Sequence, residues 1–541
     1  MIASRNHHFV RAYAALVVAS GLAGCGGEVQ RTGAKDPPRA EAHRAKMTAL
    51  WSPARQARLR KAVRGASKAF NAHDVERLSD RVLTWTDAWV LSAAEIDSGV
   101  ADASMSAAEA DASRACLEVE RVEYAAILDG LNTACRVPGC QAERIADLDW
   151  QLIEAEQTTG ACTQPAFYRG YLQTNLAEPE ALAQQAQFLA LEALGDDQRL
   201  ERYLTATLAR HRSVSALRTR LLLLEARRQL RSGTTPASAL DLLDEGIAEA
   251  TGRDDALEVA ALRGARSDAN QQLSKHAEAL SDARIALELT RRALGEEHVA
   301  TALARASYAS VAWCDCDYPT PPDYGGAERE LDLARRTLTR VLGPTHPLTA
   351  RIELAQGQVA ASLGDAGAAQ RWLTRGTSST AVSFGAEHLA MSDAVRCNAK
   401  AEGALGNGNA SMSLFGRALQ LDRQLLGEVH PRVAAGWDAL GVSQLRARHF
   451  TPGLASFTQS ARVYQKLGDP SGVVGALLRL SETYRALGQR ADALQHLEQA
   501  EQLLRGLPEE RRDLLGRQVC PWLSALSSEL QLPPTRPSSC E

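Results

Sequence analysis

Histidine recurs at fixed spacing in the second half of the chain, and an imidazole can bind a metal or transfer a proton. The four copies are 48, 42 and 42 residues apart, at His298, His346, His388 and His430. Stacked helices lie about 10 Å apart, whereas zinc ligands must all lie about 2.0–2.1 Å from one ion. We therefore predict that these histidines cap helices or pack between repeats, and we predict no metal site.

Cysteine is the second residue type that could do chemistry, and the chain has ten. The pairs Cys314/Cys316 and Cys135/Cys140 lack the spacing and nearby histidines of a zinc site, which favours structural thiols or loop disulfides. In an oxidising compartment we expect disulfides among the first four cysteines after Cys25, or between the last two. These are Cys116, Cys135, Cys140 and Cys162, and then Cys520 and Cys540. The connectivity stays open, and the odd number that remains leaves at least one cysteine unpaired within the chain.

Sequence motifs of common enzymes are missing. We find no G-x-S-x-G, H-E-x-x-H, G-K-[ST], H-R-D or D-F-G, so we predict no catalytic residues and no cofactor. With 61 basic and 65 acidic residues the net charge is −4, which offers no general basic field for nucleic acid. An enzyme with its site in residues 50–190 stays as an alternative, and it would need a deep pocket with convergent Asp, Glu or His side chains.

Each recurring histidine ends a five-residue segment that begins with Leu-Gly or Phe-Gly. The glycines of these segments are Gly295, Gly343, Gly385 and Gly427. Positions +4 and +11 after the histidine hold only Ala, Ser or Gly in all four copies. Residues seven apart share one face of a helix, so small side chains there let neighbouring helices approach closely. A second helix carries alanine pairs at the same spacing, such as Ala279 and Ala286. The period near 42 residues indicates a solenoid of stacked helix pairs.

This pattern resembles tetratricopeptide repeats of the kinesin light chain type, clearly over 255–505 and in degenerate form over 191–254. The resemblance implies an all-α, right-handed superhelical solenoid whose concave groove binds peptides or proteins. Many such repeats place Asn on the inner helix to hold a ligand backbone. The corresponding candidate groove positions here, nine after each histidine, are Ser307, Ala355, Cys397 and Ala439. The missing Asn ladder argues against recognition through a backbone clamp.

The first 25 residues resemble a bacterial lipoprotein signal. Arg5 and Arg11 form a positive n-region, a twelve-residue apolar run is too short to span a bilayer, and Leu22-Ala23-Gly24-Cys25 matches the lipobox. The resemblance implies cleavage of residues 1–24 and acylation of Cys25. Gly26 after the cysteine favours the periplasmic face of the outer membrane. Residues 25–48 are rich in Gly, Pro and charge, which predicts a flexible tether.

A helical N-terminal domain is expected over 49–190, and a C-terminal cap and tail over 506–541. Trp85, Trp89 and the segment 114–121 resemble the helical linker of repeat-bearing bacterial Ser/Thr kinases, although no catalytic kinase half is present. A basic helix follows the tether and would either touch anionic lipid or form a solvated face. Its residues are Arg55, Arg58, Arg60, Lys61, Arg64 and Lys68.

These patterns together predict a lipid-anchored scaffold of the bacterial cell envelope. Its partners would be an unidentified protein or peptide and, through the N-terminal lipid, the membrane, with no nucleic acid. The alternatives are an accessory or regulatory partner of a bacterial Ser/Thr kinase signalling system, and the enzyme considered above.

Overall fold

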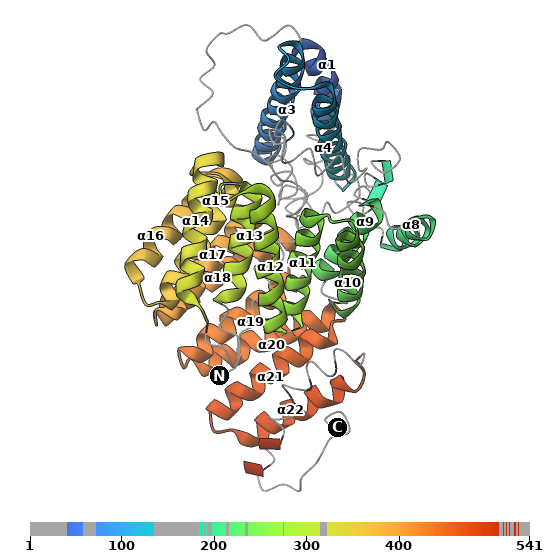
Figure 1. Cartoon of the computed structure of the whole chain (residues 1–541). Coiled ribbons are helices and arrows are strands. Elements are labelled where there is room, and N and C mark those ends of the chain that lie inside the picture. The colour runs from blue at the N-terminus through green and yellow to red at the C-terminus, as the bar shows by residue number, and fades with distance from the viewer. Residues whose placement is uncertain are drawn as a thin grey trace. The chain divides into compact units, whose positions relative to one another are not determined.

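The computed structural model describes residues 40–57, 72–134, 197–211, 216–232, 236–273, 275–313 and 322–507, with a few single positions besides (Figure 1). The signal segment, Cys25 and most of the other cysteines lie outside these ranges. The described elements are all helices, as the sequence predicts. None of the described helices combines the length and apolarity that crossing a bilayer would require.

The chain divides into two compact units. The first unit comprises Ala3–Val359 with Ser378–Gly385, and the second comprises Ala360–Thr377 with Ala386–Glu541. The division therefore falls inside the predicted repeat array, within helices α15 (Pro347–Ser362) and α16 (Ala366–Phe384).

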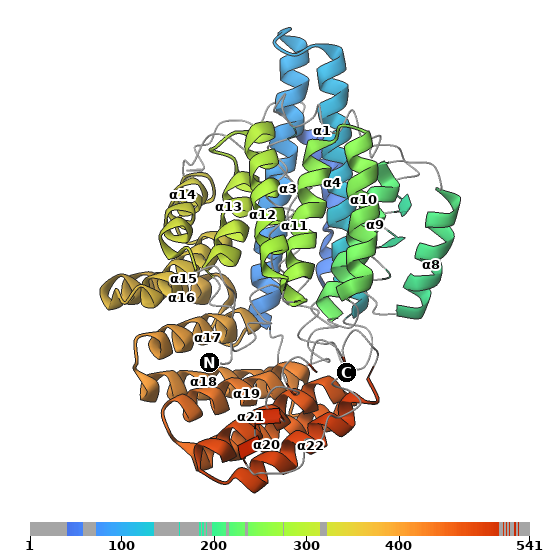
Figure 2. The same cartoon turned by 60° about the horizontal axis from the view of Figure 1, so that its bottom comes forward.

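The first unit begins with α1 (Ala40–Leu50), α3 (Ala72–Ala101) and α4 (Ala107–Ala134), which lie side by side in Figures 1 and 2. A short helix, α8 (Asp197–Arg210), precedes the repeats. The repeat helices that follow are α9 (Ala216–Ser232), α10 (Pro236–Gly252), α11 (Ala256–Gln272), α12 (His276–Leu294), α13 (Val299–Ala312), α14 (Tyr324–Leu342) and α15 (Pro347–Ser362).

The second unit continues the same alternation of first and second helices. Its helices are α17 (Leu389–Ala404), α18 (Gly408–Leu426), α19 (Pro431–Arg446), α20 (Phe450–Lys466), α21 (Pro470–Ala486) and α22 (Arg490–Leu504). Consecutive repeat helices pack against one another from α9 to α14 in the first unit and from α17 to α22 in the second. The first helices of adjacent repeats also touch, in the pairs α9 with α11, α11 with α13, and α19 with α21. We call these first helices the inner row, because they approach one another more closely than the second helices do.

Small side chains make this close packing possible. At position +4 the four side chains are between 0 and 1 % exposed, so every copy is buried as the sequence predicts. At position +11, a methyl group on Gly441 would lie 2.7 Å from the ring of Phe457 on the paired helix. The predicted all-α class and the stacking of tetratricopeptide-like helix pairs are thus confirmed in each unit.

The N-terminal end differs from the prediction of a flexible tether over 25–48. Helix α1 begins at Ala40, inside that segment, and Ala40, Met47 and Trp51 are buried in a core shared with α3 and α4. Charged residues between these widely spaced apolar positions conceal the helical period, and tertiary burial stabilises a helix whose own sequence signal is weak.

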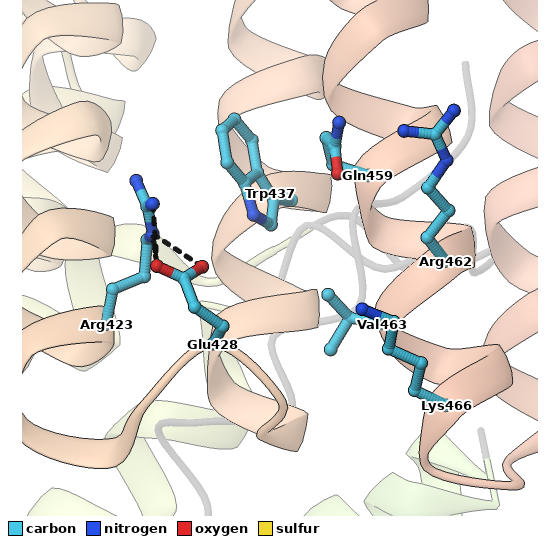
Figure 3. Close-up of a pocket in the computed structure, with 7 residues that line it drawn as sticks. All are labelled: Arg423, Glu428, Trp437, Gln459, Arg462, Val463 and Lys466. Carbon is cyan, nitrogen blue, oxygen red and sulfur yellow. Dashed lines mark hydrogen bonds and ion pairs between the residues drawn. The ribbon is translucent and has the colours of Figure 1, made fainter.

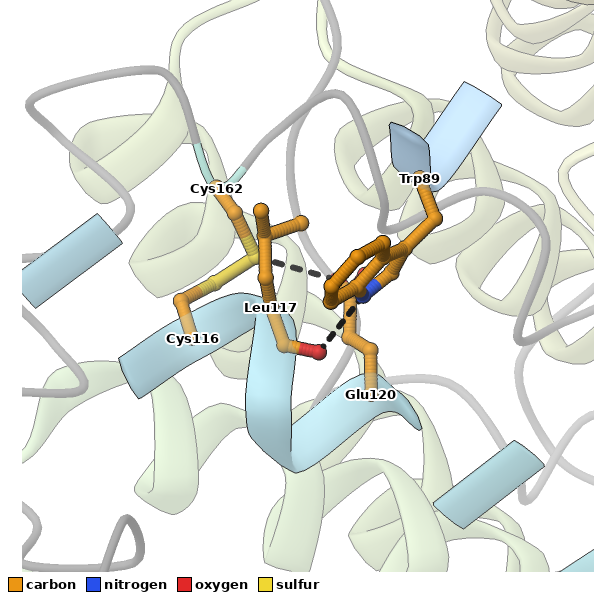
Figure 4. The surroundings of a disulfide bond; sticks show 5 residues. All are labelled: Trp89, Cys116, Leu117, Glu120 and Cys162. Carbon is orange, nitrogen blue, oxygen red and sulfur yellow. Dashed lines mark hydrogen bonds between the residues drawn. A yellow bond between two sulfur atoms is a disulfide. The ribbon is translucent and has the colours of Figure 1, made fainter. Parts of the chain in front are cut away.

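A core of aromatic and sulfur-containing side chains fixes α3 against α4. Trp85 stacks on Tyr124 with ring centroids 3.7 Å apart, and Trp89 donates its Nε1–H to the carbonyl of Leu117 at 2.9 Å. A disulfide joins Cys116 to Cys162 (Figure 4), one of the pairings that the sequence left open. The kinase-linker motif residues Trp85, Trp89 and Cys116 are therefore buried core residues here.

Candidate interaction surface

The recurring histidines are helix N-caps. In each copy the Nδ1 atom accepts the backbone N–H two residues later, at 3.0 Å for His298, 3.2 Å for His346, 3.1 Å for His388 and 3.1 Å for His430. This bond satisfies one of the free N–H groups at the start of an inner-row helix. The spacing allows either helix capping or packing between repeats, and these bonds show capping.

The preceding glycines end the second helices. Gly295, Gly343, Gly385 and Gly427 have φ between 80° and 95°, a region that side chains with a Cβ rarely adopt. A glycine that ends one helix and a histidine that begins the next set the turn between successive repeats.

Burial keeps two of the capping imidazoles neutral. It lowers the pKa of His298 to about 4, and burial together with the positive charge of Arg81 lowers that of His346 to about 3. A neutral ring leaves Nδ1 free to accept, so the cap persists well below pH 7.

The four candidate groove positions do not share one environment. Ser307, Ala355 and Ala439 on the inner row are partly exposed, so they belong to a surface that a ligand can reach. Cys397 is different: its side chain is 1 % exposed, and burial raises the pKa of its thiol to about 12. It is a packing residue, so the expectation that it lines the groove is corrected.

A charge network that the sequence analysis missed joins α17, α18 and α19. Asp422 on α18 has no exposed surface, and its carboxylate accepts from Arg396 at 2.5 Å and from Arg432 at 3.4 Å. Asp393 accepts from the same two arginines, at 2.8 and 2.9 Å, but is 43 % exposed. Burial acts to raise the pKa of Asp393, yet the two guanidinium groups outweigh it and hold that pKa below its usual value.

Further ionisable groups lie on the inner-row helices. Burial raises the pKa of Asp438 on α19 and lowers that of Lys400 on α17. In the first unit, burial raises the pKa of Glu258 to about 7 and that of Asp268 to about 8. Glu258 and Asp268 are buried, so the ionisable groups that the inner row exposes in part are Asp393, Lys400 and Asp438.

A single group of potential metal ligands occurs among the described residues, formed by Cys116, Glu120 and Cys162. Its two sulfur atoms are joined to each other, and Cys162 lies 3.3 Å from Oε1 of Glu120. A disulfide offers no thiolate to a metal, so these residues form a structural crosslink.

No protein-family profile and no curated protein sequence matches the chain. Solved structures with similar arrangements include some that are described as having tetratricopeptide or similar repeats. A Podosopora anserina protein described as a kinesin light chain is 17 % identical, with 38 % of this chain and 95 % of that chain covered and a TM-score of 0.32. The Rap protein complexed with competence and sporulation factor is 13 % identical, with coverages of 65 % and 98 % and a TM-score of 0.42. Yeast Tom70 is 10 % identical, with coverages of 91 % and 96 % and a TM-score of 0.36.

Proposed function

We propose that this protein is a lipid-anchored scaffold of the bacterial cell envelope that binds a protein or peptide through its inner-row helices. The observation that carries the proposal is the repeated helix pair, in which a glycine end, a histidine cap and small packing residues hold one row of helices close together. Such a scaffold presents side chains at fixed spacing and needs no conformational change to bind.

The membrane part of the proposal stands on the sequence alone. The lipobox ending in Cys25 supports acylation, and dual or multiple acyl chains give stable anchoring where one chain does not. The oxidising compartment that export implies would suit the Cys116–Cys162 disulfide.

Crosslinking in intact cells, followed by mass spectrometry, tests the binding part. We expect at least one protein to crosslink repeatedly to residues of the repeats, and a chain that crosslinks to no protein would contradict the proposal. The intact mass of the mature protein tests the anchor: an acylated species beginning at Cys25 is expected, and an N-terminus without acyl mass would contradict it.

A further inference from the structure

A hollow of 370 Å³ lies at one end of α18, α19 and α20 in the second unit. Figure 3 shows the indole of Trp437 between an ion pair, Arg423 with Glu428, and the side chains of α20. Arg462 and Lys466 on α20 also line the hollow. Three cationic groups therefore face one carboxylate, and two positive charges are in excess.

The first unit contains the same location in an earlier repeat, and it provides an internal reference. The buried pair Ala327 and Ala334 on α14 corresponds to Gly453 and Ser460 on α20, since both pairs are seven apart at the start of a second helix. Counted from these pairs, Arg336 corresponds to Arg462 and Arg340 to Lys466. Counted from the capping histidines, Glu297 corresponds to Val429 and Arg305 to Trp437.

Every cation of the reference location has an acidic partner, and Asp332 is shared by Arg335 and Arg336. Arg336 binds Asp332 at 2.6 Å, and Arg340 binds Glu297. Arg305 is buried between Glu296 and Glu330 and pairs with both. The reference location is thus internally neutralised.

Those partners are missing in the later repeat. Thr458 stands at the position of Asp332, and Val429 at that of Glu297. Within the part of the chain that the structure describes, the side chains of Arg462 and Lys466 form no ion pair or hydrogen bond. The charge of Lys466 only helps Arg423 to lower the pKa of Glu428. Val429 is 45 % exposed, and the indole of Trp437 occupies the place of a paired guanidinium.

From these differences between the two repeats we infer that the hollow binds an acidic peptide segment of a partner protein. The segment would carry at least one large apolar side chain beside its carboxylates. Arg462 offers a planar fork that suits a carboxylate, and Lys466 adds a second point charge. Trp437 and Val463 supply the apolar lining of the hollow, and an indole is an effective anchor in interfaces. The inference rests on the proposed protein-binding function and names the partner's chemistry at the surface where the inner-row helix α19 meets α18 and α20.

The test uses the full mature chain and a fluorescein-labelled hexapeptide of alternating glutamate and leucine, with a lysine–leucine hexapeptide for comparison. Fluorescence anisotropy at 0.15 M salt measures both affinities. Variant V429E/T458D restores the two acidic partners of the reference location, and R336A/R340A removes the corresponding cations of that location as a matched control. Circular dichroism checks that both variants fold.

We expect saturable binding of the acidic peptide, at least tenfold weaker binding to V429E/T458D, unchanged binding to R336A/R340A, and no binding of the lysine peptide. Equal affinity of the wild type and V429E/T458D for the acidic peptide would overturn the assignment of the binding site to this hollow. Failure of the acidic peptide to bind the wild type, or equal competition by inorganic phosphate or anionic vesicles, would overturn the peptide assignment. If a partner still crosslinks to V429E/T458D in cells as it does to the wild type, this inference fails while the proposed function stands.

Discussion

Replacing one capping histidine by asparagine should make the free energy of unfolding depend less on pH between pH 7 and pH 5. His298 accepts the N–H of Ala300 at 3.0 Å, and burial lowers its pKa to about 4, whereas an unfolded histidine has a pKa of about 6.5. A base whose pKa is lower in the folded state stabilises the fold fully above its ordinary pKa. That contribution is lost as the pH falls from about 6.5 toward 4.

The size of the effect follows from the two pKa values. At pH 5 the unfolded imidazole is almost fully protonated, while the folded ring is still mostly neutral. With one pKa unit worth about 1.4 kcal/mol, lowering the pH from 7 to 5 removes about 2 kcal/mol of unfolding free energy through His298. Asparagine also accepts at an N-cap and does not titrate, so H298N should lose about 2 kcal/mol less than the wild type over this range.

Urea unfolding followed by circular dichroism at pH 7 and pH 5 measures both profiles. The acids Glu258 and Asp268 act in the opposite direction over this range, so the quantity compared is the difference between variant and wild type at each pH. His449 precedes α20 without a side-chain cap bond, which makes H449N the control. The reasoning is refuted if H298N and the wild type lose the same unfolding free energy between pH 7 and pH 5.

Three further substitutions test the packing and the buried charges. Gly441→Ala should lower the unfolding free energy measured in urea by about 1–3 kcal/mol, because its methyl group meets the ring of Phe457. Gly475→Ala has open space around its methyl group and should not lower the unfolding free energy. Equal losses in the two variants would contradict the packing argument. Asp422→Ala leaves two buried arginines with only the partly exposed Asp393 as a shared partner. It should cost about 3–5 kcal/mol of unfolding free energy, and a cost below about 1 kcal/mol would show that the network is dispensable. Burial raises the pKa of Asp268 to about 8, so the stability it gives is present below its ordinary pKa and lost as the pH rises through 8. Asp268→Asn should therefore raise the melting temperature at pH 8 and change it little at pH 4, and no difference between the two pH values would contradict this.

The elements of the repeats could be predicted because their determinants are local in sequence. His298 lies three residues after Gly295, and a helix end, a turn and a cap need no distant partner. Small residues at +4 and +11 also mark their helical face by spacing alone. These signals predict the helix pairs, and they narrow the role of the histidines to capping or packing between repeats.

The interaction surface could be predicted only in part, because charge partners come from helices far apart in sequence. Asp422 meets Arg396 across 26 residues, and nothing in the local sequence marks it as buried. Cys397 shares its repeat position with Ser307, yet it is packed in its own repeat. The change from Glu297 to Val429 is visible in the aligned repeats, but its consequence depends on knowing that Arg340 binds Glu297.

The most direct test of the account is photo-crosslinking in living cells from single positions on the repeats. A photoreactive phenylalanine derivative would replace Ala439 on the inner-row helix α19 or, in a separate strain, Val382 on α16, which is 73 % exposed. Binding through the inner row should give a discrete protein adduct from Ala439 and none from Val382. The same adduct pattern from both positions, or no adduct from Ala439, would contradict binding through the inner row.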